Sequence, residues 1–172
     1  MRTEVLNASA GAGLLSLVAF FAIIRLLPEW TSTTTVMKIF VIAVLGGIGL
    51  SLSVKRELRA SGISYLTGVS VALVLIALLQ FWNISPSTVL VLVVVSLLPL
   101  RFYPPSGLLD ALLTGPLYFS GPITVLGLLA PLKVFESVAL PLLIVYAGFI
   151  GGIAAFIFSV VLLLVGMRTN LK

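Results

Sequence analysis

The sequence predicts an all-α protein, a polytopic transmembrane helix bundle with about six spans. Of its 172 residues, 60% are hydrophobic and only 9% are charged, and the mean hydropathy is +1.30. Soluble domains are about 45–50% apolar and about 25% charged, so this chain has too little polar surface to cover a globule in water. Two patterns support the prediction: charges separate long apolar stretches, and small residues recur at the spacing of packed membrane helices.

The composition also excludes several kinds of chemistry. The chain has no Cys and no His, which removes disulfides, thiolate nucleophiles, haem ligation and most zinc ligation. We therefore expect no cofactor and no metal ion. The formal net charge is +5, and the basic residues lie almost entirely between apolar runs. We attribute them to membrane topology and to contact with anionic membrane lipid, and we expect no nucleic-acid partner.

Six apolar stretches follow one another in what we interpret as a single membrane domain, residues 1–172. A helix needs about 20 apolar residues to cross about 30 Å of hydrocarbon, and each stretch approaches or exceeds that length. The last stretch is the longest, so we expect it to be tilted. The predicted spans are 8–27, 36–54, 62–82, 87–102, 107–132 and 138–166.

Charged and turn-forming residues set these boundaries. The first span ends before Pro28, and the second ends at the charged run that begins with Lys55. The uncharged stretch 60–100 is too long for one span. Ser85 and Pro86 divide it, because Ser caps helix N-termini and Pro favours the first helical position.

The basic residues predict the orientation of the spans. With six spans, one side of the membrane holds more of them than the other, and the richer side should be cytoplasmic. The richer side holds Arg2, Lys55, Arg56, Arg59, Arg101, Arg168 and Lys172, and the poorer side holds Arg25, Lys38 and Lys133. We therefore expect a multi-pass protein of the plasma membrane with both termini in the cytoplasm. A re-entrant 107–132 is the alternative, and it would move the C-terminus to the other side.

Small residues at every fourth position form stripes along two of the predicted helices. Such stripes let helix backbones approach closely, which matters in lipid because no hydrophobic effect drives helices together. They are open to two interpretations: packing within the bundle, or contact of one stripe, above all the long one in the last span, with another subunit. The stripes are Ala147, Gly151, Ala155 and Ser159 in the last span, and Ala43, Gly47 and Ser51 in the second.

The predicted fifth span contains the pairs Gly115-Pro116 and Gly121-Pro122, and we expect it to be broken there. Proline removes a backbone donor and frees a carbonyl in the preceding turn, and transporters use such breaks to bind solutes. Hydroxyl groups at a similar depth could line a polar pocket with the break. The candidate pocket residues are Gly121, Pro122, Tyr118, Ser120, Thr124 and Tyr146. The alternative is a kinked helix whose freed groups are satisfied by neighbouring Ser and Thr.

None of the charged residues is expected near the middle of the bilayer, where a charge would mark a functional site. Asp110 comes closest, but it lies about one turn into its helix, where it can favour the positive end of the helix dipole. The sequence contains no strong enzyme motif of the nucleotide-binding, serine hydrolase or zinc protease kinds.

One pattern resembles the layout of the type IV prepilin peptidase family. The run Lys55-Arg56-Glu57-Leu58 follows a span, and Ser106-Gly107-Leu108-Leu109-Asp110 comes about fifty residues later. The resemblance implies an aspartate from a Gly-x-Gly-Asp motif that works with a second membrane-proximal aspartate. Here Leu109 replaces the second glycine, and Asp110 is the only Asp in the chain, so two aspartates cannot pair. We therefore do not expect an active peptidase.

The sequence favours a non-catalytic, structural or accessory subunit of a larger multi-subunit membrane complex, for example an energy-converting one. Its packing signals are abundant, and it lacks ligands, acids and redox residues at the expected mid-depth. Its partners would be membrane lipid and other membrane subunits. The alternative is a small-solute transporter, or the substrate-binding membrane component of one, that uses the fifth span. An intramembrane enzyme is a third class, and it would require Asp110.

Overall fold

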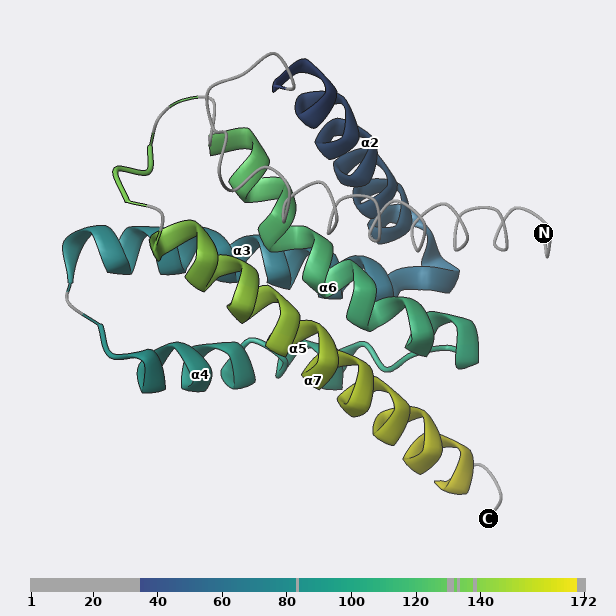
Figure 1. The fold of residues 1–172 in the computed structure, drawn as a ribbon. Coiled ribbons are helices and arrows are strands. Elements are labelled where there is room, and N and C mark those ends of the chain that lie inside the picture. The colour runs from purple at the N-terminus through teal and green to yellow at the C-terminus, as the bar shows by residue number, and fades with distance from the viewer. Residues whose placement is uncertain (1–34, 83, 130–131, 133, 138, 170–172) are drawn as a thin grey trace.

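The computed structural model describes residues 35–82, 84–129, 132, 134–137 and 139–169, with side chains from residue 45 onward except at 86, 168 and 169. The predicted span 8–27 and the N-terminus lie outside the described residues. The described part is helical and contains no strand (Figure 1). Its elements are α2 (Thr35–Val54), the 3₁₀ helix η1 (Arg56–Leu58), α3 (Arg59–Phe81), α4 (Pro86–Val95), α5 (Pro99–Phe102), α6 (Leu108–Leu129) and α7 (Ala139–Thr169).

Three helical segments are long and apolar enough to cross a membrane. They are Arg56–Phe81, Leu108–Leu129 and Ala139–Met167, and two shorter apolar segments are Leu45–Val54 and Ser87–Phe102. The all-helical fold and the membrane-spanning character of these three segments agree with the sequence prediction. The count of six spans stays a prediction.

The central helix of the described bundle is α6, which packs against α2, α3 and α7. Helices α3 and α6 run parallel, because Ser61 contacts Asp110 at their starts and Tyr65 contacts Thr124 further along. Helix α7 runs antiparallel to α6, since Ser159 contacts Thr114 near the end of α7. Successive helices joined by short connections tend to run in opposite directions, as α6 and α7 do.

Glycines let α3 and α6 approach at backbone contact. A Cβ atom at Gly68 would lie 2.4 Å from the main-chain oxygen of Tyr118, and one at Gly121 would lie 2.7 Å from the nitrogen of Val69. A larger residue at either position would push the two helices apart. The close crossing of α3 and α6 thus depends on glycines, which have no side chain, as expected for helices that associate in lipid.

The structure corrects the prediction of a broken fifth span. Helix α6 continues from Leu108 to Leu129, with Pro116 and Pro122 inside it. Within this helix Ser120 Oγ donates to the Leu117 oxygen at 2.8 Å, and Thr124 Oγ1 donates to the Ser120 oxygen at 2.9 Å. The burial of α6 among its neighbours holds the remaining turns in place.

The break occurs instead in the predicted span 87–102, which divides into α4 and α5. Pro99 has no N–H to donate to the Val95 oxygen, so a helical bond is missing there. The N–H groups of Leu97 and Leu98 donate three residues back, to Val94 at 3.1 Å and to Val95 at 3.1 Å. The chain therefore forms a tighter turn between the two helices.

Candidate functional site

The most polar part of the described interior is the junction where α3 and α6 begin. Asp110, the third residue of α6, is only 2% exposed. Its Oδ1 accepts the Ser61 N–H at 3.1 Å, and its Oδ2 accepts the Ser106 N–H at 3.0 Å. One carboxylate therefore binds the first turn of α3 and the residues that lead into α6.

Hydroxyl groups complete this junction. Ser61 Oγ lies within hydrogen-bonding distance of both Asp110 Oδ1 and the Asp110 main-chain oxygen, so it can donate to either. Ser106 Oγ donates to the main-chain oxygen of Glu57 at 2.7 Å. Residue Leu58, which precedes α3, makes no side-chain cap, so Asp110 supplies that cap from another helix.

The electrostatics of the junction come from helix ends. The first N–H groups of a helix carry partial positive charge, and here the starts of α3 and α6 both face the Asp110 carboxylate. A buried carboxylate is unfavourable unless it accepts hydrogen bonds, and these donors meet that need. The arrangement is suited to fixing two helices relative to each other.

A second set of hydroxyls continues from Asp110 across three helices. Thr114 Oγ1 donates to the Asp110 main-chain oxygen at 2.7 Å, and Ser64 Oγ of α3 donates to the Thr114 main-chain oxygen at 2.7 Å. Ser159 Oγ of α7 makes a longer contact of 3.4 Å with Thr114 Oγ1. These bonds connect α3, α6 and α7 at neighbouring depths.

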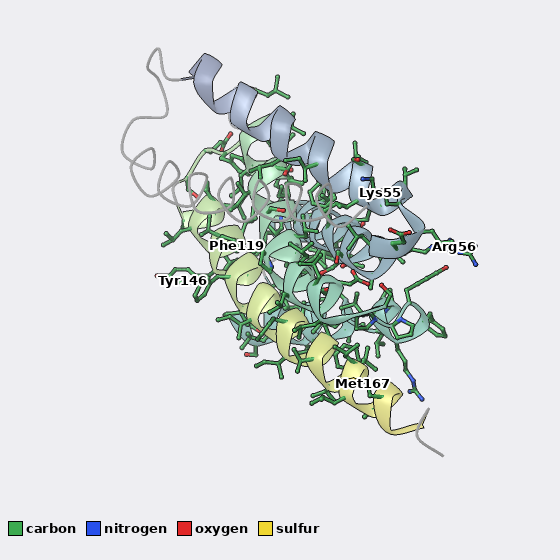
Figure 2. All side chains as sticks on the ribbon, turned by 90° about the vertical axis from the view of Figure 1, so that its right-hand side faces the viewer. Lys55, Arg56, Phe119, Tyr146 and Met167 are labelled. Atoms are coloured by element: carbon green, nitrogen blue, oxygen red, sulfur yellow. The ribbon has the colours of Figure 1, made fainter. Side chains whose placement is uncertain are left out.

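The predicted pocket residues do not gather around one cavity. Tyr118, Ser120 and Thr124 are buried on α6, whereas Tyr146 on α7 is 58% exposed and points away from the bundle (Figure 2). The expected contribution of Tyr146 is therefore wrong, because the face of α7 that bears it is not the face that packs on α6. The other candidates, Gly121 and Pro122, are buried in helix contacts.

Tyr118 has the most confined side chain of the candidate pocket. Its Oη lies 2.7 Å from Ser96 Oγ, at the turn between α4 and α5. A Cβ atom at Gly151 of α7 would lie only 2.0 Å from Tyr118 Cε1. The tyrosine thus fills the space that the glycine leaves and ties α6 to the α4–α5 turn.

The two small-residue stripes face different surroundings. The stripe on α7, namely Ala147, Gly151, Ala155 and Ser159, is buried within the bundle. On α2, Gly47 and Ser51 are exposed, and a Cβ atom at Gly47 would meet nothing within 4 Å. The side chain of Ala43 lies outside the described residues. The stripe on α7 therefore packs within the bundle, and the expectation that it faces another subunit is wrong, because α6 and its neighbours cover it.

Basic residues gather at the same end of the bundle as the Asp110 junction. We call them the basic rim: Lys55, Arg56, Arg59 and Arg101, all of them exposed. The Arg59 guanidinium lies 4.9 Å from the centroid of the Tyr103 ring. In the described part of the chain, no group of three His, Cys, Asp or Glu residues is placed to hold a metal ion.

The structure brings together the two segments that resemble the prepilin peptidase layout. Ser106 lies against Glu57, and Asp110 lies beside the start of α3. The side chains that contact the Asp110 carboxylate are Ser61 and Ser106, and neither is an acid. Sequence reasoning placed Asp110 near its own helix start but missed the contacts of Ser61, Ser96 and Ser106, because the identity of a serine does not reveal its partner.

Comparisons with family models, with curated proteins and with solved structures gave no significant match.

Proposed function

We propose that this protein is a non-catalytic accessory subunit of a larger membrane complex, in which it serves as a rigid helical scaffold. One observation carries the proposal: every buried polar side chain of the described residues makes a hydrogen bond within the protein. These side chains are Ser61, Ser64, Asp110, Thr114, Ser120, Thr124 and Ser159. Their bonds run between helices or back to the preceding turn.

This pattern supports a structural role because a substrate site needs polar groups that converge on a ligand. Here the interior hydroxyls already have protein partners, and Tyr146 points outward. The same facts give the transport alternative less support. They also favour Asp110 as a cap for two helices over Asp110 as a reacting group.

The outer surface supports a position among lipids and other helices. Helices α4 and α7 expose large apolar side chains, including Val91, Phe149 and Ile157, which suit contact with acyl chains. On α2 the exposed Gly47 and Ser51 form a flat surface that another helix could approach closely. We assign this surface to a neighbouring subunit.

The distribution of residues along α3 supports the proposed topology. The basic rim lies at its start, and the exposed Phe81 and Trp82 lie at its end. A helix of 23 residues is about 35 Å long at 1.5 Å per residue, close to the thickness of the hydrocarbon core. We propose six spans in the plasma membrane, with the basic rim and both termini in the cytoplasm.

Solubilisation of native membranes in a mild detergent, followed by blue-native electrophoresis, tests the proposed function. We expect the chain to migrate in a discrete species well above its own mass of 18.2 kDa, with partners of fixed stoichiometry. The variant Gly47→Leu should release it from that species without lowering its thermal stability. The matched control is Gly166→Leu on α7, where an added Cβ also meets nothing within 4 Å. Migration of the wild-type chain as a lone monomer would contradict the proposal.

A further inference from the structure

We propose that Arg59, Arg101 and Tyr103 form a binding site for the phosphate group of an anionic membrane lipid. The site lies on the basic rim, where α3 begins and α5 ends. It goes beyond the scaffold role, since it assigns one lipid class and one place on the surface.

The geometry of Arg59 is the first reason. Its guanidinium lies 4.9 Å from the centroid of the Tyr103 ring, a distance at which cation and ring attract each other. Stacking on the ring restricts the flexible side chain before any ligand arrives. A guanidinium presents several N–H donors in a planar fork that matches phosphate oxygens.

The position of Arg101 is the second reason. It lies in the last turn of α5, two residues before Tyr103, so their Cα atoms are at most about 7 Å apart. Its side chain is exposed, and we assign it to the same phosphate as Arg59. Two guanidinium groups converging on one anion is the chemistry expected for a phosphodiester.

The local charge balance is the third reason. The basic rim has four positive charges, and Glu57 is the exposed carboxylate among them. The nearby carboxylate of Asp110 is buried and accepts hydrogen bonds from Ser61 and Ser106. Within the described ranges, no carboxylate forms an ion pair with Arg59 or Arg101. Among the described carboxylates, therefore, none competes with an external anion for these two guanidinium groups.

The neighbouring side chains favour a lipid over free phosphate. Phe102 is 78% exposed and Leu98 is also exposed, and both belong to the segment that carries Arg101. A lipid would place its phosphate at the two arginines and its acyl chains along these apolar groups, whereas inorganic phosphate would gain nothing from them.

The test uses the full-length protein in nanodiscs of mixed phosphatidylglycerol and phosphatidylcholine, with retained lipids identified by native mass spectrometry. A titration of phosphatidylglycerol in detergent gives the dissociation constant. Arg59→Gln and Arg101→Gln should each weaken binding of phosphatidylglycerol about fivefold. The matched control is Arg56→Gln, which removes the same charge from a side chain that points away from the bundle (Figure 2). It should weaken binding by less than about twofold.

Two further variants keep the proposal testable if Arg59→Gln does not fold. Tyr103→Leu preserves every charge but removes the ring, and Arg59→Lys preserves the charge but removes the fork; each should weaken binding about threefold. Equal losses in Arg56→Gln and Arg59→Gln would overturn the site in favour of diffuse attraction. Equal retention of the two lipids would also overturn it, as would displacement of the lipid by inorganic phosphate at the same concentration. The site would also be overturned if the single variants Tyr103→Leu and Arg101→Gln both bound phosphatidylglycerol as tightly as the wild-type protein.

Discussion

Helix α6 and the α4–α5 segment are both apolar and both contain proline, yet only the second is broken. Helix α6 holds two prolines inside 22 continuous residues, whereas a single proline at Pro99 separates α4 from the four-residue α5. The difference lies in their surroundings. Helix α6 is packed on several sides, while α4 exposes much of its surface, including Leu90 and Val94. Contacts with neighbouring helices can therefore keep a helix continuous through a proline, whereas a less enclosed helix breaks at one.

The largest expected effect comes from separating α6 from α3. In Gly68→Ala the new Cβ would lie 2.4 Å from the main-chain oxygen of Tyr118, and neither backbone can move without separating the helices. We expect the free energy of unfolding to fall by about 3 kcal/mol, the upper part of the range for overpacking. Reversible unfolding in sodium dodecyl sulfate measures it. The control Gly47→Ala adds the same atom in open space and should raise stability by up to about 1 kcal/mol, because alanine favours a helix over glycine. Equal stability of the two variants would contradict the explanation.

The next effect concerns how each helix begins. The carboxylate of Asp110 binds the start of α6, whereas Ser85 before α4 makes no side-chain cap to the backbone. Asp110→Ala leaves the buried Ser61 N–H without its acceptor and should destabilise the protein by about 2–3 kcal/mol. Asp110→Asn keeps one acceptor oxygen and should have about half that effect. Thermal unfolding in detergent measures both, with the exposed Glu57→Gln as the control. A loss in Glu57→Gln as large as that in Asp110→Ala would count against this assignment.

A smaller effect is expected where α6 meets the α4–α5 turn. Tyr118 Oη and Ser96 Oγ lie 2.7 Å apart, so Tyr118→Phe and Ser96→Ala both remove this bond, and Ser96→Ala also removes the bond from Ser96 Oγ to the Val93 oxygen at 2.6 Å. Each should lower the free energy of unfolding by about 1 kcal/mol. The double variant should be about as stable as Ser96→Ala alone, which a double-mutant cycle measures. Fully additive losses would mean that the two hydroxyls act independently.

The smallest change in stability is expected from Pro99→Ala, which sharpens the comparison directly. Alanine restores an N–H that can donate to the Val95 oxygen, so α4 and α5 should join into one helix. Because the chain has no native Cys, spin labels can be attached at Leu90 and Phe102, which are both exposed. The distance between the two backbone positions should approach about 18 Å, the length of twelve residues in a continuous helix.

The corresponding change in α6 provides the control. Pro116→Ala should leave the helix as it is, since α6 already continues through that proline. Labels at the exposed Leu112 and Leu128 should report the same separation before and after the substitution, near 24 Å along sixteen helical residues. An altered separation there would show that Pro116 bends the helix, and the contrast with Pro99 would be lost.

The length of the apolar stretches and the charged or turn-forming residues between them predicted the approximate bounds of three helices. The expected 36–54, 62–82 and 138–166 correspond to Thr35–Val54, Arg59–Phe81 and Ala139–Thr169. These bounds depend on local features, namely how many apolar residues precede a charge or a turn. The face of each helix that packs inward could not be predicted from the sequence, because the helices are apolar on every face. Tyr146 shows this limit: it was expected beside Tyr118 but points outward.

The sequence by itself determined that this protein is helical and belongs in a membrane, because apolar runs of about 20 residues suit a lipid environment and satisfy their backbone groups within a helix. It also determined where basic residues concentrate and which positions are small enough for close packing. Only the tertiary structure decided which proline breaks a helix and which hydroxyls pair. It also decided that Asp110 caps two helices at once. Those outcomes depend on contacts between segments about fifty residues apart, such as Ser61 with Asp110, and no local pattern specifies such contacts.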